Sequence, residues 1–197
     1  MIITVASFKG GVGKTTTAIH IAEFLQSDAS TLLVDGDFNR SSLQWAKAGN
    51  LKFQVCDEAE GIKYGRKVEH IVIDTQARPS LEELVTLAAG CDLMIVPTTP
   101  DALAMGATFK MFKHLDGQTF KMLLTIVPPK PSRRGEEARA AIEAAKLPLF
   151  STDIRQLDAF KKAAEQGKPV NDIEGDRNSG IAWNCYQKVG EEILRHG

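Results

Sequence analysis

Cysteine is scarce in this chain of 197 residues, and its three copies, Cys56, Cys91 and Cys185, lie far apart. Their number is odd, and none of them belongs to a CxxC pair or to a Cys/His pattern with metal-ligand spacing. These features argue against a disulfide framework and against a zinc ribbon. We therefore expect buried free thiols in a reducing cytoplasm.

Long hydrophobic runs are also missing. No stretch approaches the roughly 18 apolar residues of a membrane-spanning helix, and the apolar segment Met1–Ser7 has no basic leader or cleavage site. That segment is therefore expected to be a strand, and no membrane partner is expected.

An excess of charge of one sign is absent as well. Lys and Arg total 24 against 25 for Asp and Glu, a formal net charge of −1. This balance excludes a globally basic nucleic-acid binder, although a local basic patch remains possible. With 43% hydrophobic residues, the chain is not of the disordered class either. The length predicts one domain over residues 1–197.

Short apolar runs alternate with helical patterns along the whole chain. The expected strands are Ile2–Ala6, Thr31–Val34, Phe53–Cys56, His70–Asp74, Leu93–Val96 and Lys121–Val127, with a short edge segment at Phe150–Ile154. The expected helices are Lys14–Gln26, Ser41–Ala48, Ser80–Ala89, Leu103–Leu115, Arg134–Lys146, Leu157–Gln166 and Gly180–Arg195. This order predicts an α/β fold, with a mostly parallel sheet flanked by helices on both faces.

A glycine-rich segment, Lys-Gly-Gly-Val-Gly-Lys-Thr-Thr, connects the first strand to the first helix. Glycines allow consecutive backbone N–H groups to surround phosphate oxygens, and the helix N-terminus adds its dipole. Lys14 can neutralise the β- and γ-phosphates, and the Thr15 hydroxyl can hold Mg²⁺. Phe8 stands where the standard P-loop pattern has glycine, so the motif is an altered one. The expected nucleotide-binding residues are Lys9, Gly10, Gly11, Val12, Gly13, Lys14, Thr15 and Thr16.

This segment resembles the deviant Walker A motif of the ParA/MinD family, and the short N-terminus resembles the small ParA type. The resemblance implies a P-loop NTPase fold, ATP and Mg²⁺ as cofactors, and a nucleotide-sandwich homodimer. It also implies that Lys9 reaches the partner's phosphates, which gives Lys9 and Lys14 catalytic roles.

Two groups of carboxylates follow predicted strands. Asp35 and Asp37 end the second strand, where the family carries Asp-x-Asp-Pro-Gln, and Asp37 matches the aspartate assigned to water activation. Here Phe38 and Asn39 replace Pro-Gln. Asp74 ends an apolar strand in the manner of a Walker B segment, which suits it to the Mg²⁺ shell. The expected metal residues are therefore Thr15, Asp37 and Asp74; the simpler alternative for each aspartate is a turn or helix cap.

Two later segments carry less specific patterns. Pro128 and Pro129 follow the sixth strand, where the resemblance places the adenine pocket, and a plain proline-rich turn fits almost as well. Basic residues gather late in the chain, and the resemblance to ParA proteins makes Arg155, Lys161 and Lys162 candidates for binding double-stranded DNA without sequence specificity. Solvated helix faces explain such residues equally well.

The resemblance implies a slow, partner-stimulated ATPase that binds nucleoid DNA in its ATP state and positions a cargo. The cargo could be a plasmid, a chromosome region or a carboxysome, with a ParB-like or McdB-like adaptor. Two alternatives remain open. One is a metabolic or metallocluster member of the superfamily, and the other is a nucleotide-gated binding module that hydrolyses nothing.

Overall fold

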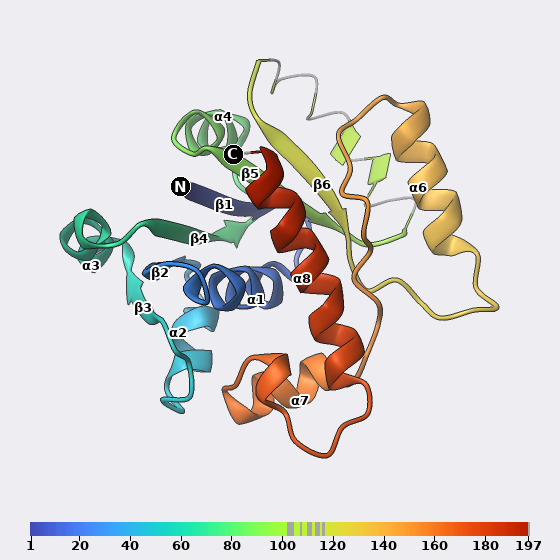
Figure 1. The fold of residues 1–197 in the computed structure, drawn as a ribbon. Coiled ribbons are helices and arrows are strands. Elements are labelled where there is room, and N and C mark those ends of the chain that lie inside the picture. The colour runs from blue at the N-terminus through green and yellow to red at the C-terminus, as the bar shows by residue number, and fades with distance from the viewer. Residues whose placement is uncertain (102–104, 107, 110–111, 113–114, 116, 197) are drawn as a thin grey trace.

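A six-stranded parallel sheet in the order β3-β2-β4-β1-β5-β6 forms the centre of the computed structural model (Figure 1). The structure describes residues 1–101, 105–106, 108–109, 112, 115 and 117–196. The strands are β1 (Ile2–Ser7), β2 (Thr31–Gly36), β3 (Gln54–Asp57), β4 (His70–Ala77), β5 (Leu93–Thr98) and β6 (Phe120–Leu124). The predicted mostly parallel sheet is confirmed.

Helices connect these strands or follow the last of them. They are α1 (Lys14–Gln26), α2 (Ser41–Ala46), α3 (Glu58–Tyr64), α4 (Leu81–Ala89), α6 (Arg134–Ala144), α7 (Ala159–Gln166) and α8 (Ser179–His196), with 3₁₀ turns η1 (Gly65–Lys67) and η2 (Val170–Asp172). Among the described residues, no helix has the length and apolar character needed to cross a membrane.

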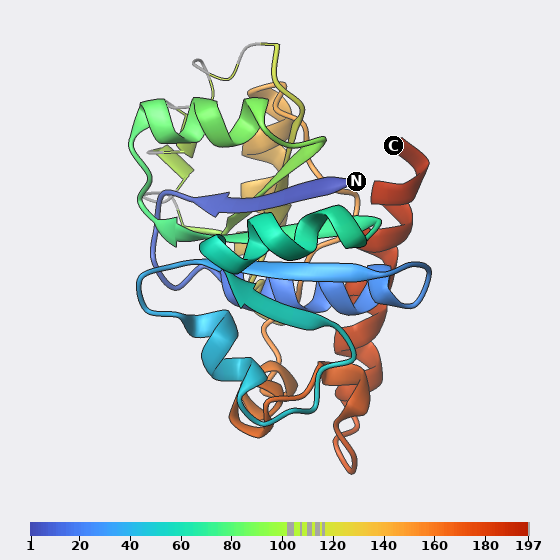
Figure 2. The same cartoon turned by 90° about the vertical axis from the view of Figure 1, so that its left-hand side faces the viewer.

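Alternating side chains of each strand supply the two faces of the sheet, because successive residues of a strand point in opposite directions. On β2, Leu33 packs into the core beneath α1 and α8, whereas Leu32 and Val34 join Cys56 in the core beneath α3. On β5, the same alternation places Ile95 in the core beneath α1 and α8 and Met94 in a different core, which also contains Leu84. Figure 2 shows α3 on the near side of the sheet and α1 on the far side. The expectation of helices on both faces is therefore confirmed.

Helix α8 crosses α1 at very close range. A Cβ atom at Gly190 would lie 2.2 Å from the ring of Phe24, so only the missing side chain leaves room for that ring. Around this crossing, Ile21, Leu25 and Val189 are completely buried. This contact fixes α1, which carries the glycine-rich loop at its N-terminus, between the sheet and α8 (Figure 1).

The structure departs from the expected elements in several places. The sixth strand ends at Leu124 rather than Val127, and residues 150–154 contain no named strand, since only the isolated bridges Met122–Leu149 and Val127–Arg155 flank them. Helix α3 was not expected, because its seven residues bury none of their side chains deeply and show no apolar stripe. Much of the helix expected over Leu103–Leu115 lies outside the described residues.

Candidate functional site

The glycine-rich loop is an open concave turn at the carboxyl end of β1. Gly11 and Gly13 have φ angles of 75° and 83°, in the left-handed region that favours glycine. A Cβ atom at either position would meet nothing within 4 Å, so the space above the loop is free for a ligand. The loop is anchored from below, because the buried Val12 carbonyl accepts a 2.7 Å hydrogen bond from the Thr125 hydroxyl. The backbone can therefore surround a phosphate group, as the sequence predicts.

Asp74 lies directly beside the start of α1. Its Oδ2 accepts hydrogen bonds from the Thr15 hydroxyl at 2.8 Å and from the Ser42 hydroxyl at 2.9 Å. Among the described residues, its buried Oδ1 has no hydrogen-bond partner. Burial raises the pKa of the Asp74 carboxyl to about 6, although both hydroxyls and the nearby Lys14 charge oppose the shift.

These residues fit a hydrated Mg²⁺ ion. The orphaned Oδ1 supplies a hard oxygen next to the Thr15 hydroxyl, and a cation there would favour the ionised carboxylate. Asp74 and Thr15, two of the three predicted metal residues, are therefore brought into direct contact.

The two aspartates after β2 have different environments. Asp35 is completely buried, and its carboxylate accepts the backbone N–H groups of Asp37 and Leu43 at 3.0 and 2.9 Å. It therefore shapes the turn and the start of α2, which is the simpler of the two readings. Asp37 accepts the backbone and side-chain N–H groups of Asn39 at Oδ1 only, at 3.1 and 3.2 Å.

The departures from the family pattern have structural consequences. Asn39, in place of glutamine, holds one oxygen of the Asp37 carboxylate and leaves Oδ2 to act on another group. Phe38, in place of proline, leaves its ring 85% exposed beside that carboxylate. A single exposed hydrophobic residue is common on protein surfaces, so this exposure alone assigns Phe38 no role.

Lys9 points away from its own loop toward the end of β5, where its ammonium group pairs with the Asp101 carboxylate. Both side chains are partly exposed. The Ser7 hydroxyl donates to the Lys9 carbonyl at 2.8 Å, so the backbone at Lys9 is fixed while its side chain reaches outward.

Pro128 and Pro129 line a cavity of about 1010 Å³ together with Arg155 and the first turns of α8. The segment enters this cavity from Thr125, the residue bonded to the glycine-rich loop. No residue of the glycine-rich loop lines this cavity, so the role of the two prolines in base binding stays a prediction.

The two DNA candidates on α7 are paired with acids. The Lys161 ammonium lies 3.0 Å from Asp158, and that of Lys162 lies 2.7 Å from Asp176. The Lys161–Asp158 pair is exposed on both sides and is therefore weak, whereas the Asp176 side chain of the second pair is only 9% exposed. The third candidate, Arg155, is exposed at the rim of the proline cavity.

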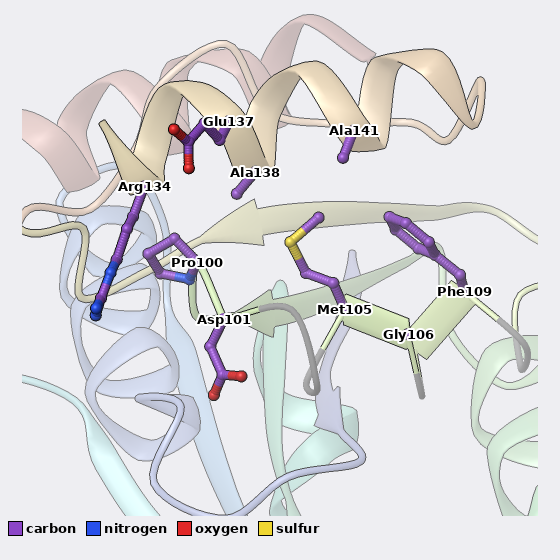
Figure 3. Close-up of a pocket in the computed structure, with 9 residues that line it drawn as sticks. All are labelled: Pro100, Asp101, Met105, Gly106, Phe109, Arg134, Glu137, Ala138 and Ala141. Atoms are coloured by element: carbon purple, nitrogen blue, oxygen red, sulfur yellow. The ribbon is translucent and has the colours of Figure 1, made fainter. Parts of the chain in front are cut away.

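A second cavity, of about 650 Å³, lies between α6 and the segment after β5 (Figure 3). Met105 and Phe109 face Ala138 and Ala141 across it, and Asp101 lies at one end. The carboxylate that holds Lys9 therefore also borders an apolar cavity.

Three residues of this site were not predicted: Ser42, Asp101 and Thr125. Asp101 and Thr125 follow the ends of β5 and β6, so the rule that ligands lie beyond the carboxyl ends of parallel strands could have indicated both. No sequence signal marks Ser42, which reaches Asp74 only because β2 and β4 are neighbours.

The chain is similar to known proteins in sequence and in fold. The model of the CobQ/CobB/MinD/ParA nucleotide binding domain matches residues 3–170. Maintenance of carboxysome distribution protein A from Gloeobacter kilaueensis is 29% identical over 204 aligned residues, which cover 98% of this chain and 94% of that protein.

Two solved structures share the fold. Cyanthece apo McdA has a TM-score of 0.73 at 15% identity and covers 99% of this chain and 98% of its own. A plasmid partition protein from Borrelia burgdorferi bound to AMPPNP has a TM-score of 0.73 at 19% identity, with 98% of each chain covered. The family model covers the glycine-rich loop, both aspartate turns and the six strands except the first residue of β1. The chain belongs to the CobQ/CobB/MinD/ParA nucleotide-binding family.

Proposed function

We propose that this protein is an ATP-dependent switch that dimerises with ATP and Mg²⁺, binds DNA without sequence specificity, and positions a cargo. The observation that carries the nucleotide part is the Thr15–Asp74 hydrogen bond at the mouth of the open glycine loop. It joins the hydroxyl and the carboxylate that a nucleotide-bound Mg²⁺ ion requires.

Three residues have separate proposed roles at this site. Lys14 supplies positive charge beside Asp74, where phosphate charge must be balanced. Asp37 keeps one carboxylate oxygen for orienting an attacking water. Lys9 reaches outward from the loop, which suits contact with the nucleotide of a second copy.

DNA binding is supported by exposed cations at one end of the molecule. Arg155, Lys161 and Lys162 lie in the segment that surrounds α7, and a dimer would present this set twice. Phosphate contacts dominate binding of this kind and make it depend strongly on salt.

The cargo and its adaptor are proposed from the relatives. The Gloeobacter protein is named for carboxysome distribution, and the Borrelia protein for plasmid partition. We therefore propose a partner protein of the ParB or McdB type, with hydrolysis stimulated by that partner and release from the nucleoid in the ADP state.

The deciding experiment measures binding to random-sequence duplex DNA with ATP–Mg²⁺, with ADP–Mg²⁺ and without nucleotide, across a salt series. We expect binding only with ATP, weakening steeply as salt rises. The Lys14→Ala variant is the control, because it should lose nucleotide and DNA binding together. Dimerisation with ATP but no DNA binding would overturn the DNA part and favour the metabolic members of the superfamily.

A further inference from the structure

His20 lies at a junction of helices behind the nucleotide site. It is completely buried on α1, and its ring stacks on Tyr186 of α8 with centroids 4.8 Å apart. The rings of Trp45 of α2 and Phe160 of α7 are nearly perpendicular to it, with centroids 6.0 and 5.4 Å from that of His20. This one imidazole, on the helix after the phosphate loop, therefore contacts the helix after the Asp37 turn and two C-terminal helices.

The partners of its ring nitrogens fix its protonation. Nδ1 lies 2.6 Å from the Thr16 carbonyl oxygen, which can only accept a hydrogen bond. Nε2 lies 3.0 Å from the Val170 backbone N–H, which can only donate. The ring must therefore be neutral, with its proton on Nδ1 and a lone pair on Nε2. Burial agrees, since it lowers the pKa of His20 to about 4.

A second polar contact runs parallel to the first. The hydroxyl oxygens of Tyr186 and Thr17 lie 3.1 Å apart, within hydrogen-bond distance, in a buried setting. Thr16 and Thr17 directly follow the proposed Mg²⁺ residue Thr15. The first turn of α1 is therefore bonded to η2 through His20 and to α8 through Tyr186.

Helix α2 joins the same junction. The Trp45 indole N–H donates to the Lys168 carbonyl at 3.1 Å, just after α7 ends. Gly167 makes this approach possible, because a Cβ atom there would lie 2.7 Å from the Trp45 carbonyl oxygen and 2.4 Å from the Ala48 Cβ. The turn that carries Asp37 leads into α2, so both nucleotide-contacting turns are connected to the segment 159–172.

We propose that His20 is a positioning residue through which occupancy of the nucleotide site sets the placement of α7 and η2, the segment that carries Lys161 and Lys162. The inference rests on the proposed nucleotide binding but not on DNA binding. It assigns the coupling to two bonds of one neutral imidazole, supported by the Tyr186–Thr17 contact.

The first test reads the tautomer directly. Nitrogen-15 NMR of the full chain should show His20 with a protonated Nδ1 and an unprotonated Nε2 between pH 5.5 and 8, a range chosen above its lowered pKa. A ring protonated on Nε2 would contradict the Val170 bond and overturn the proposal without any reference to nucleotide.

The second test is hydrogen–deuterium exchange of residues 159–172 with and without AMPPNP–Mg²⁺. In the wild type, exchange should slow about threefold or more on nucleotide addition, since ordering lowers local opening. His20→Asn keeps a donor near Nδ1 but loses the acceptor for Val170, and Tyr186→Phe removes only the hydroxyl. Both should bind a fluorescent ATP analogue within about threefold of the wild type and lose most of the slowing.

His70→Gln is the matched control, because His70 is a second buried histidine, on β4 rather than at this junction. It should retain the full slowing. Normal slowing in folded His20→Asn and Tyr186→Phe would overturn the proposal, as would nucleotide binding by the wild type with unchanged exchange at 159–172. If the wild type binds no nucleotide, the proposed function fails together with the coupling. The tautomer measurement then still tests the two hydrogen bonds of His20.

Discussion

Lys9 and Asp101 form an ion pair that joins the glycine-rich loop to the end of β5. The side chains are 47% and 40% exposed, so solvent screens the pair and limits its worth to about 1 kcal/mol or less. A pair this weak can exchange for a phosphate, which carries more charge and more acceptor oxygens. In the proposed dimer, the nucleotide of a second copy would compete with Asp101 for the Lys9 ammonium group.

Substituting Asp101→Asn should ease dimerisation. The amide releases Lys9 without changing the size of the side chain, so less nucleotide should be needed to form the dimer, by about two- to fivefold. Light scattering after size-exclusion chromatography across an AMPPNP–Mg²⁺ series measures this. Asp158→Asn is the control, because it removes a similar exposed partner from Lys161. An equal shift in both variants would rule out a specific role for Asp101.

Asp37→Ala should separate binding from hydrolysis. The carboxylate is proposed to orient the attacking water, so ATP turnover should fall by about 100-fold while nucleotide affinity changes little. Phosphate release and a fluorescent-nucleotide titration report the two quantities. Asp57→Ala removes another aspartate at a strand end, one that only caps α3, and should keep normal turnover. Wild-type hydrolysis in Asp37→Ala would show that another group orients the water.

Ser42→Ala should weaken the binding of Mg²⁺ at the site. It removes one of two hydroxyl donors to Asp74, which makes the ionised carboxylate less favourable. The Mg²⁺ concentration for half-maximal nucleotide binding should rise by about two- to tenfold, with a stability loss of about 1 kcal/mol. Ser80→Ala costs about as much stability through the α4 capping box, and should leave the Mg²⁺ dependence unchanged. If both behave alike, Ser42 acts on stability only.

Gly167→Ala should destabilise the protein by about 2–4 kcal/mol. The residue has a φ of 59°, and its new methyl group would press on Trp45 and Ala48. Gly175 also has a positive φ, 71°, but a Cβ there meets nothing within 4 Å. Gly175→Ala should therefore cost only about 1 kcal/mol. Urea unfolding compares the free energies of unfolding of the two variants. Equal losses would mean that α2 and α7 move apart to accept the methyl group at little cost.

The stabilising effect of His20 should depend on pH. Its folded pKa, about 4, lies below the ordinary 6.5, so the unfolded chain binds the proton more readily. His20 therefore contributes fully above pH 6.5, and this contribution is lost as pH falls toward 4, by about 3 kcal/mol in all. Asp74 acts with the opposite sign, because its folded pKa is raised.

The difference in unfolding free energy between the wild type and His20→Gln isolates this effect from the titration of Asp74 and other carboxylates. It should be largest at pH 7 and should shrink steadily by pH 4.5. Urea melts at several pH values measure it. A difference independent of pH would indicate that His20 is not held neutral.

The sequence was informative wherever local chemistry decides structure. Alternating apolar runs predicted the sheet, and the Ser80–Glu83 capping box that marks the start of α4 is present. The glycine loop and the Asp74 strand end were found because their function requires a fixed residue order. The loop and this strand end lie at the same edge of the sheet, because the carboxyl ends of parallel strands share one edge.

What the sequence did not predict depends on contacts between distant segments. Helix α3 has no apolar stripe, and the Asp57 cap at its start is too short a signal to predict a helix by itself. His20 has two specific hydrogen-bond partners, one of which lies 150 residues away. Pairings of this kind follow from strand order, which local patterns do not encode.

The crossing of α1 and α8 has a consequence for how this chain can vary. Phe24 and Gly190 share one volume, in which a ring fills the space that a side chain would take. Natural selection can therefore conserve the combined volume of the two side chains rather than the identity of either residue. A relative with a larger residue at one position should carry a smaller one at the other, so covariation between these positions would record the spacing between the nucleotide helix and α8.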